Sequence, residues 1–203
     1  TGISNYRMKR LFDLIVSLTG LLILSPLFLI IGFAIKISDK GPVFFRQIRA
    51  GRNGRDFLIY KFRTMKKAPF HVEGNFNPGD RSRITSVGKF LRRSKLDELP
   101  QLINVLKGDM SIVGPRPEIP RWVTVYPERW EKVLSVRPGI TDNSSILFRN
   151  EESMLSQSED PEKTYRDIIL PKKLGLYEVY VDTHSFLGDI KLIFKTIISV
   201  FFK

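Results

Sequence analysis

The amino-acid sequence predicts an α+β protein in which an apolar N-terminal membrane segment precedes a small mixed α/β body. Residues 14–35 carry no charged side chain, and a helix of that length, at about 1.5 Å per residue, reaches across the hydrocarbon core of a bilayer. From residue 41 onward, short apolar runs alternate with Gly and Pro, a pattern typical of short strands and helices. We therefore divide the chain into a membrane segment, 1–40, and a body, 41–203.

The membrane segment is interrupted at its middle by Ser25 and Pro26. A proline inside a helix removes one backbone hydrogen bond and bends the helix, because its ring collides with the preceding turn. The Ser25 hydroxyl is placed to satisfy the carbonyl that loses its donor. The sequence therefore predicts a bend or a break at this point.

Basic residues flank the membrane segment on both sides, and such residues mark the cytoplasmic face of a membrane. They are Arg7, Lys9, Arg10, Lys36, Lys40, Arg46, Arg49, Arg52 and Arg55. A re-entrant helix-break-helix, whose two ends return to one face, explains both flanks, whereas a kinked transmembrane helix explains the proline equally well. Asp13 lies at the entry, where an acidic side chain needs a partner, and we expect that partner to be Arg10 or Lys9.

The first half of the body is expected to hold a hairpin, a loop and two helices. Short strands at 43–45 and 57–60 are joined by the turn 51–54, and a long polar loop covers 63–83. Ser86 is expected to cap a helix that runs to Arg93. Leucine and isoleucine at helical spacing in 99–106, followed by Gly108, predict a second helix with a buried face. Asp97 and Glu98 lie at the first turn of that helix.

The second half of the body is expected to be mainly helical. We expect helices over 122–136 and 174–181, an acidic surface over 151–167, and Pro-containing loops around Arg116 and Arg137. From Phe186 to Phe201, apolar residues and lysines take opposite sides of a predicted helix. Such a helix lies in the membrane interface or packs against the core. We favour C-terminal interfacial amphipathic helices.

Composition excludes several kinds of site. The chain has no cysteine, so disulfides, thiolate metal sites and cysteine nucleophiles are excluded. It has only two histidines, His71 and His184. The formal net charge of +12 calls for a negatively charged partner: nucleic acid, anionic lipid or a phosphorylated substrate. We expect no nucleic acid, because no nucleic-acid-binding motif is present and the basic residues cluster beside the membrane segment.

Several cations are candidates for binding phosphate groups. Lys61 and Arg63 follow a predicted strand, and Arg92 precedes the acidic pair. A single basic side chain is most often a solvated surface charge. Arg116 and Arg137 are the stronger candidates because adjacent prolines restrict their backbone, and guanidinium groups bind phosphate oxygens in pairs.

Asp97 and Glu98 form an acidic pair beside these cations. Ser94 and Asp97 fit a capping box, in which the carboxylate only satisfies a backbone N–H, and spacing alone favours this structural explanation. The functional alternative is a nucleophile or a metal pair. Adjacent carboxylates can bind Mg²⁺ through oxygen, and a carboxylate can attack phosphorus to form an acyl phosphate.

The motifs together resemble the bacterial sugar transferase family, the monotopic polyprenol-phosphate phosphoglycosyl transferases, in its small form. The resemblance covers nearly the whole chain in the family's order. The matching stretches are Ser25-Pro26, Tyr60-Lys61-Phe62-Arg63-Thr64-Met65, Ser94-Lys95-Leu96-Asp97-Glu98-Leu99-Pro100-Gln101-Leu102, Lys107-Gly108-Asp109-Met110-Ser111, Gly114-Pro115-Arg116-Pro117 and Arg137-Pro138-Gly139-Ile140-Thr141.

The resemblance implies a re-entrant membrane hairpin that breaks at Ser25 and Pro26, and a catalytic domain on the cytoplasmic face of the bacterial inner membrane. It implies that Asp97 is the nucleophile, Glu98 its partner, and Mg²⁺ the cofactor held at this pair. The donor would be a UDP-sugar, the acceptor polyprenol phosphate such as undecaprenyl phosphate, and the leaving product UMP. Such a reaction begins the assembly of a glycoconjugate such as lipopolysaccharide, capsule or exopolysaccharide. The cations at family positions near phosphate or uridine are Lys61, Arg92, Arg116 and Arg137.

One departure concerns Asp142, which follows the Arg-Pro-Gly-Ile-Thr motif where many members have Gly. The departure affects expectations about which sugar is transferred. A homo-oligomer is compatible with the sequence. The alternative function is a non-catalytic, membrane-anchored basic module that binds anionic lipid, suggested by the charge and the amphipathic C-terminus.

Overall fold

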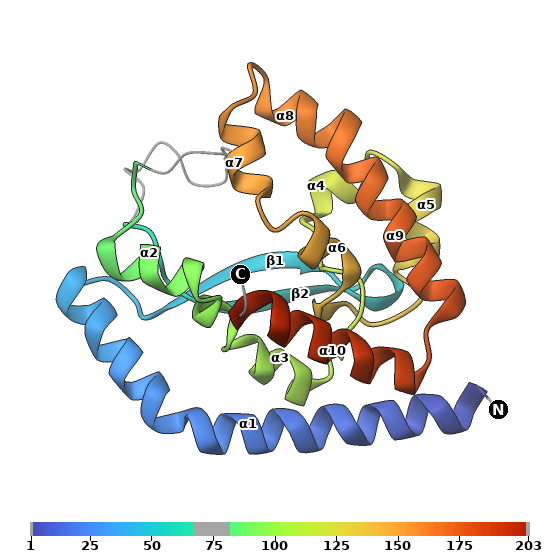
Figure 1. Ribbon diagram of the computed structural model, residues 1–203, viewed down its shortest axis with the longest axis horizontal. Coiled ribbons are helices and arrows are strands. Elements are labelled where there is room, and N and C mark those ends of the chain that lie inside the picture. Colours follow the sequence, from blue (N-terminus) through green and yellow to red (C-terminus); the bar gives the residue numbers. More distant parts are fainter. Residues whose placement is uncertain (1, 67–81, 202–203) are drawn as a thin grey trace.

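The computed structural model describes residues 2–66 and 82–201, and it shows a mixed α/β body lying along one long N-terminal helix (Figure 1). The mixed α/β class is confirmed. The described elements are α1 (Gly2–Ser38), β1 (Phe44–Ala50), β2 (Asp56–Phe62), α2 (Ser86–Arg93), the 3₁₀ turn η2 (Leu96–Glu98), α3 (Gln101–Lys107), β3 (Ser111–Val113), α4 (Pro120–Val123), α5 (Pro127–Val133), β4 (Gly139–Thr141), α6 (Asn143–Leu147), α7 (Glu151–Ser156), α8 (Pro161–Thr164), the π-helix η3 (Tyr165–Ile169), α9 (Leu170–Thr183) and α10 (Phe186–Phe201).

The long helix α1 bends but does not break. Figure 1 shows the bend, and the chain stays helical through Ser25 and Pro26. Because Pro26 has no N–H, the carbonyl four residues earlier, on Leu22, loses its donor. The Ser25 hydroxyl donates to that carbonyl at 2.8 Å, as expected from the sequence. The helix-break-helix of the sequence analysis is therefore a bend within one helix.

Both arms of α1 pack against the body. Leu21 and Leu24 of the first arm contact the apolar core around α3 and β3. In the second arm, Ile31 and Ile35 are buried against Phe62 of β2 and the helix α2. By length and composition α1 could cross a membrane, the only described helix of which this holds. The face that turns away from the body exposes large apolar side chains, namely Leu22, Ile23, Leu29, Ile30 and Phe33.

Asp13 finds a different partner from the one expected. Its carboxylate accepts a hydrogen bond from the Ile112 backbone N–H at 3.0 Å, and the side chain is buried. The expected partners are engaged elsewhere: Arg10 donates to the carbonyls of Val105 and Leu106 at the end of α3, and Lys9 pairs with a residue of α10. Positive side chains bind the free carbonyls of a helix C-terminus favourably, which explains why Arg10 contacts the end of α3 and not Asp13.

Two strand pairs hold the body together. β1 and β2 form the predicted antiparallel hairpin, which is longer than the sequence pattern indicated. β3 and β4 pair in parallel, and the Gly139 N–H donates to the Pro115 carbonyl at 2.9 Å, which brings the two Pro-containing loops side by side. At that point Gly114 and Gly139 approach so closely that a Cβ on Gly139 would lie 2.1 Å from the Gly114 nitrogen. Only residues without a side chain permit this contact.

Two details of the helices differ from the sequence prediction. The single helix expected over 122–136 is wrong, because Pro127 begins a separate helix, α5, after the short α4. A proline is favoured at a first helical position and disfavoured in a helix interior, where it removes a backbone hydrogen bond and bends or ends the helix. Thr85, rather than Ser86, caps α2, since its hydroxyl accepts from the Gly88 N–H at 2.9 Å.

The C-terminal region ends in one amphipathic helix, α10, which lies beside α1 (Figure 1). Its Asp189 is buried and pairs with the Lys9 ammonium, and Tyr180 of α9 donates to the same carboxylate at 2.9 Å. The opposite face exposes Leu187, Phe194, Ile197 and Ile198. Helix α10 therefore packs on the core through one side and leaves an apolar side uncovered next to the membrane segment.

Candidate active site

A cavity of about 1090 Å³ lies between α2, η2, α6, α7 and the first turns of α9. Its lining includes five of the seven charged residues that the sequence singled out: Lys61, Arg92, Asp97, Glu98 and Arg116. These residues are spread over 56 positions of the chain, from residue 61 to residue 116 counted inclusively. The fold brings them to one cavity, where the cations can bind an anionic substrate and the carboxylates can react with it.

Asp97 lies in the cavity wall and does not serve as a cap. Lys95 adopts a left-handed backbone (φ 58°), and the 3₁₀ turn that follows presents Asp97. The capping box is wrong: the Ser94 hydroxyl donates to the Phe90 carbonyl at 2.9 Å, and no side chain caps η2. Asp97 is 9% exposed, and its carboxylate makes no hydrogen bond or ion pair with the described residues. An unengaged carboxylate facing a cavity is available for reaction.

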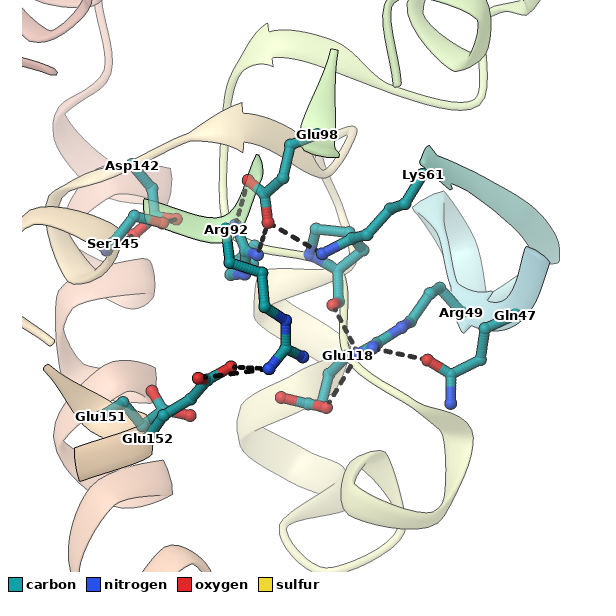
Figure 2. A network of polar contacts seen from close by, with 12 residues as sticks. Gln47, Arg49, Lys61, Arg92, Glu98, Glu118, Asp142, Ser145, Glu151 and Glu152 are labelled. Carbon is teal, nitrogen blue, oxygen red and sulfur yellow. Dashed lines mark hydrogen bonds and ion pairs between the residues drawn. The ribbon is translucent and has the colours of Figure 1, made fainter. Parts of the chain in front are cut away.

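Glu98, in contrast, is fully engaged. Lys61 donates to Glu98 Oε1 at 2.8 Å, and Arg116 donates to both carboxylate oxygens, with a distance of 3.2 Å from Nη1 to Oε2. Figure 2 shows Glu98 joined to Lys61 and to the guanidinium group beside it. Glu98 therefore fixes the positions of two cations from different parts of the chain.

The environment separates the pKa values of the two carboxyls. Burial, and next the neighbouring negative charge of Glu98, raise the pKa of Asp97. Burial would also raise the pKa of Glu98, but Arg116 and Lys61 outweigh it and hold that pKa well below its usual range. Glu98 in turn raises the pKa of Arg116. Adjacent groups whose pKa values are driven apart take different roles in catalysis.

Arg49, which the sequence predicted only as a flank of the membrane segment, stabilises the loop that carries Arg116. The Arg49 guanidinium donates to the Pro117 carbonyl at 3.2 Å and lies 3.3 Å from Glu118 Oε1 (Figure 2). Tyr165 of the π-helix donates to the other oxygen of Glu118. The local sequence around Arg49 carries no signal for this role, because its partners lie almost seventy positions away.

Arg63 and Arg137 do not line the cavity. Arg63 donates to the Asp39 carbonyl at 2.8 Å and lies 3.1 Å from the Asp39 carboxylate, just beyond the end of α1. Arg137 donates to the Gly108 carbonyl at 2.8 Å and to the hydroxyl of Tyr6 near the start of α1. The structure therefore places the Arg63 guanidinium at the C-terminal end of the membrane segment and the Arg137 guanidinium at its N-terminal end.

Asp142 positions part of the cavity wall. Its carboxylate accepts from the Ser145 backbone N–H at 2.9 Å and from the Ser145 hydroxyl at 2.8 Å, and so caps α6. Ser144 and Ser145 of that helix line the cavity. A Gly at position 142 could not cap in this way, so the departure noted in the sequence sets the geometry of this wall.

The acidic pair fits Mg²⁺ only in company with a phosphorylated ligand. The described residues contain no group of three or more His, Cys, Asp or Glu side chains able to hold a metal ion. Mg²⁺ commonly takes one or two protein carboxylates and completes its shell with water and substrate phosphates. Asp97 offers free carboxylate oxygens for this purpose, whereas both oxygens of Glu98 already accept from cations.

Comparisons with known proteins show to which proteins the chain is similar. The sequence pattern described as bacterial sugar transferase matches residues 4–203. The uncharacterized sugar transferase EpsL of Bacillus subtilis is 38% identical over 95% of this chain and 87% of its own length. The exopolysaccharide production protein ExoY of Sinorhizobium fredii is 36% identical over 95% of this chain and 84% of its own. The UDP-glucose:undecaprenyl-phosphate glucose-1-phosphate transferase of Escherichia coli is 37% identical over 97% of this chain, which spans 41% of that protein.

Proposed function

Because this chain belongs to the bacterial sugar transferase family, we propose that it transfers a sugar 1-phosphate from a UDP-sugar to a polyprenol phosphate. The observation that carries the proposal is the free Asp97 carboxylate beside the fully engaged Glu98 in a cation-lined cavity. The name of the Escherichia coli relative describes the same exchange with glucose and undecaprenyl phosphate. The product would be the first lipid-linked intermediate of a glycoconjugate such as exopolysaccharide.

The reaction would proceed in two displacements at one phosphorus atom. A carboxylate oxygen of Asp97 attacks the sugar-bearing phosphorus of the donor, and the bond to the bridging oxygen breaks. UMP leaves with that oxygen, and an aspartyl-phosphosugar remains on the enzyme. An oxygen of polyprenol phosphate then attacks the same phosphorus and displaces the Asp97 carboxylate. Two steps with moderate activation barriers replace one transfer between two anions, which would have a high barrier.

The surrounding cations would stabilise the charge that develops on the phosphate oxygens. Arg116 and Lys61 are held in place by Glu98, so they need little reorganisation when the donor binds. Arg92 lies 3.2 Å from the exposed carboxylate of Glu152 and can exchange that partner for phosphate. A bound Mg²⁺, held by Asp97 with Glu98 adjacent, would supply further charge neutralisation at the diphosphate.

The test of this function is UMP release from a panel of UDP-sugars with Mg²⁺ and undecaprenyl phosphate present. We expect UMP to form with at least one UDP-sugar, and to depend on the divalent cation. Without acceptor, mass spectrometry should find a phosphosugar adduct on Asp97. A module that only gathers anionic lipid would bind vesicles in a salt-sensitive way and release no UMP from any member of the panel, and that result would refute the transferase.

We also propose that α1 is re-entrant, with the body on the cytoplasmic face of the bacterial inner membrane. The support is that both arms of α1 pack on the same body while the outer face around the bend exposes apolar side chains. A straight span would carry its second arm away from β2 and α2. This arrangement puts the cavity near the headgroup level, where a polyprenol phosphate presents its phosphate.

Cysteine labelling tests this topology cleanly, because the chain has no cysteine of its own. In Asn5→Cys and Lys40→Cys variants we expect a membrane-impermeant reagent to reach both sites from the cytoplasmic side only. Adding Pro26→Leu should straighten the helix and move one site to the other side, since the bend depends on the proline. Labelling of the two single-cysteine proteins from opposite sides would show a transmembrane helix.

A further inference from the structure

Lys173 is a buried lysine that the chemistry proposed above does not use. It lies near the start of α9 and is only 5% exposed, yet it lines the same cavity as Asp97. A charged side chain is seldom buried unless it is paired. Its ammonium lies 2.7 Å from Oε2 of Glu151, the first residue of α7, and Glu151 lines the cavity too.

The ammonium of Lys173 is held in a fixed place. It lies 5.1 Å from the centre of the Tyr165 ring, a cation–π contact. Tyr165 is itself fixed, because its hydroxyl donates to Glu118 and its ring packs 5.0 Å from that of Trp122. Tyr165 begins the π-helix η3, a type of irregularity that occurs often at functional sites. The fold thus sets this lysine at one point of the cavity wall.

The Lys173–Glu151 pair keeps hydrogen-bonding capacity for a ligand. An ammonium has three N–H donors, and within the described residues the Lys173 ammonium has one carboxylate as an ion-pair partner, that of Glu151. The other carboxylate oxygen of Glu151 has no partner there. A donor and an acceptor therefore lie side by side in the cavity. Figure 2 shows Glu151 with Glu152 on the far side of Arg92 from Glu98.

Unpaired cations and the Lys173–Glu151 pair line the same cavity, and they suit different groups of a ligand. Lys89, Arg93 and Lys95 also line the cavity, and they make no ion pair with the described residues. These free positive charges favour phosphate groups. Lys173 and Glu151 cancel each other's charge, so they favour a neutral group that both donates and accepts hydrogen bonds. A sugar hydroxyl has that property.

We propose that Lys173 and Glu151 form the subsite that recognises the hydroxyl groups of the transferred sugar. The proposal rests on the function proposed above and names where that enzyme distinguishes one UDP-sugar from another. Two neighbouring hydroxyls of a pyranose would accept from the ammonium and donate to the carboxylate. A site built around such contacts discriminates against an epimer or deoxy sugar, because its own polar groups are then left unpaired.

The test compares Lys173→Met with wild type on UDP-glucose, UDP-galactose, UDP-xylose and UDP-N-acetylglucosamine. Methionine keeps the length of the side chain and removes the donors. For the preferred sugar we expect kcat/KM to fall about tenfold or more, as for the loss of a hydrogen bond to a charged group. The differences among the four sugars should shrink, and the inhibition constant of UMP should stay unchanged. Lys172→Met is the matched control, since Lys172 is adjacent and exposed.

The outcomes separate this inference from the proposed function. If wild type releases no UMP from any sugar, the proposed function fails and this subsite fails with it. If wild type is active but Lys173→Met lowers kcat/KM for all four sugars by one factor, the pair is only structural and the inference is overturned. Glu151→Gln, which keeps the size of a half-buried side chain and removes its charge, gives the same decision should Lys173→Met not fold.

Discussion

Replacing Asp97 by asparagine is expected to lower UMP release by about 10⁴-fold, a loss typical of removing a covalent nucleophile. The amide oxygen of asparagine carries no charge and does not attack phosphorus. The phosphosugar adduct on residue 97 should disappear from the mass spectrum at the same time. Measured turnover of Asp97→Asn with the preferred UDP-sugar, in the presence of undecaprenyl phosphate and Mg²⁺, checks the expectation.

Folding should not suffer from this change. Asp97 makes no hydrogen bond or ion pair with the described residues, and burial raises the pKa of its carboxyl, so its charge does not stabilise the folded protein. The thermal midpoint of Asp97→Asn should match that of wild type or exceed it. Asp182→Asn is the control variant, because it makes the same change at an exposed aspartate that pairs with a lysine outside the cavity. Full turnover by Asp97→Asn would show that the nucleophile is another group.

Replacing Glu98 by glutamine is expected to lower both activity and stability. Lys61 and Arg116 then lose the carboxylate that holds them, and two half-buried cations are left without their shared partner. Breaking a buried ion pair by removing one member costs about 3–5 kcal/mol. Because Lys61 and Arg116 are 19% and 29% exposed, we expect a loss at or below the lower end of that range. The misplaced cations should also reduce kcat/KM by about 10²–10³-fold, the loss seen when a preorganised group is removed. Urea unfolding in detergent and UMP release measure the two effects.

Glu152→Gln is the matched control for Glu98→Gln. Glu152 also lines the cavity and pairs with an arginine, Arg92, at 3.2 Å, but its side chain is 57% exposed. An exposed ion pair contributes at most about 1 kcal/mol, so this variant should fold nearly as well as wild type. Equal losses of stability in the two glutamine variants would mean that Glu98 does not hold the site together.

The local fold follows closely from local sequence. Apolar runs and the turn at 51–54 predict the β1–β2 hairpin, and leucine spacing with Gly108 at its end predicts α3. Even the partner of the Ser25 hydroxyl follows, because a proline always frees the carbonyl four residues earlier. The one helix predicted wrongly, 122–136, contains a proline whose preference for a first helical position outweighed the apolar pattern.

The site divides in a similar way. The residue types near Asp97 and Glu98 indicate chemistry on phosphate, and five of the seven candidates do meet in one cavity. Sequence spacing favoured a capping box for Asp97, yet Ser94 bonds to the end of α2 instead, since the left-handed Lys95 turns the chain away. Local rules could not foresee this, because the conformation of Lys95 depends on how α2 and the turn η2 pack against each other and against the rest of the body.

The sequence by itself determined the apolar segment with its bend, the hairpin, the main helices and the acidic pair, because these features depend on residues within a few positions of one another. Only the tertiary structure decided which cations serve that pair. Arg116 reaches Glu98, whereas Arg63 and Arg137 turn to the ends of α1. It also decided that Lys173 lines the cavity with Glu151. A long side chain can reach several partners, and the packing of distant segments selects one of them.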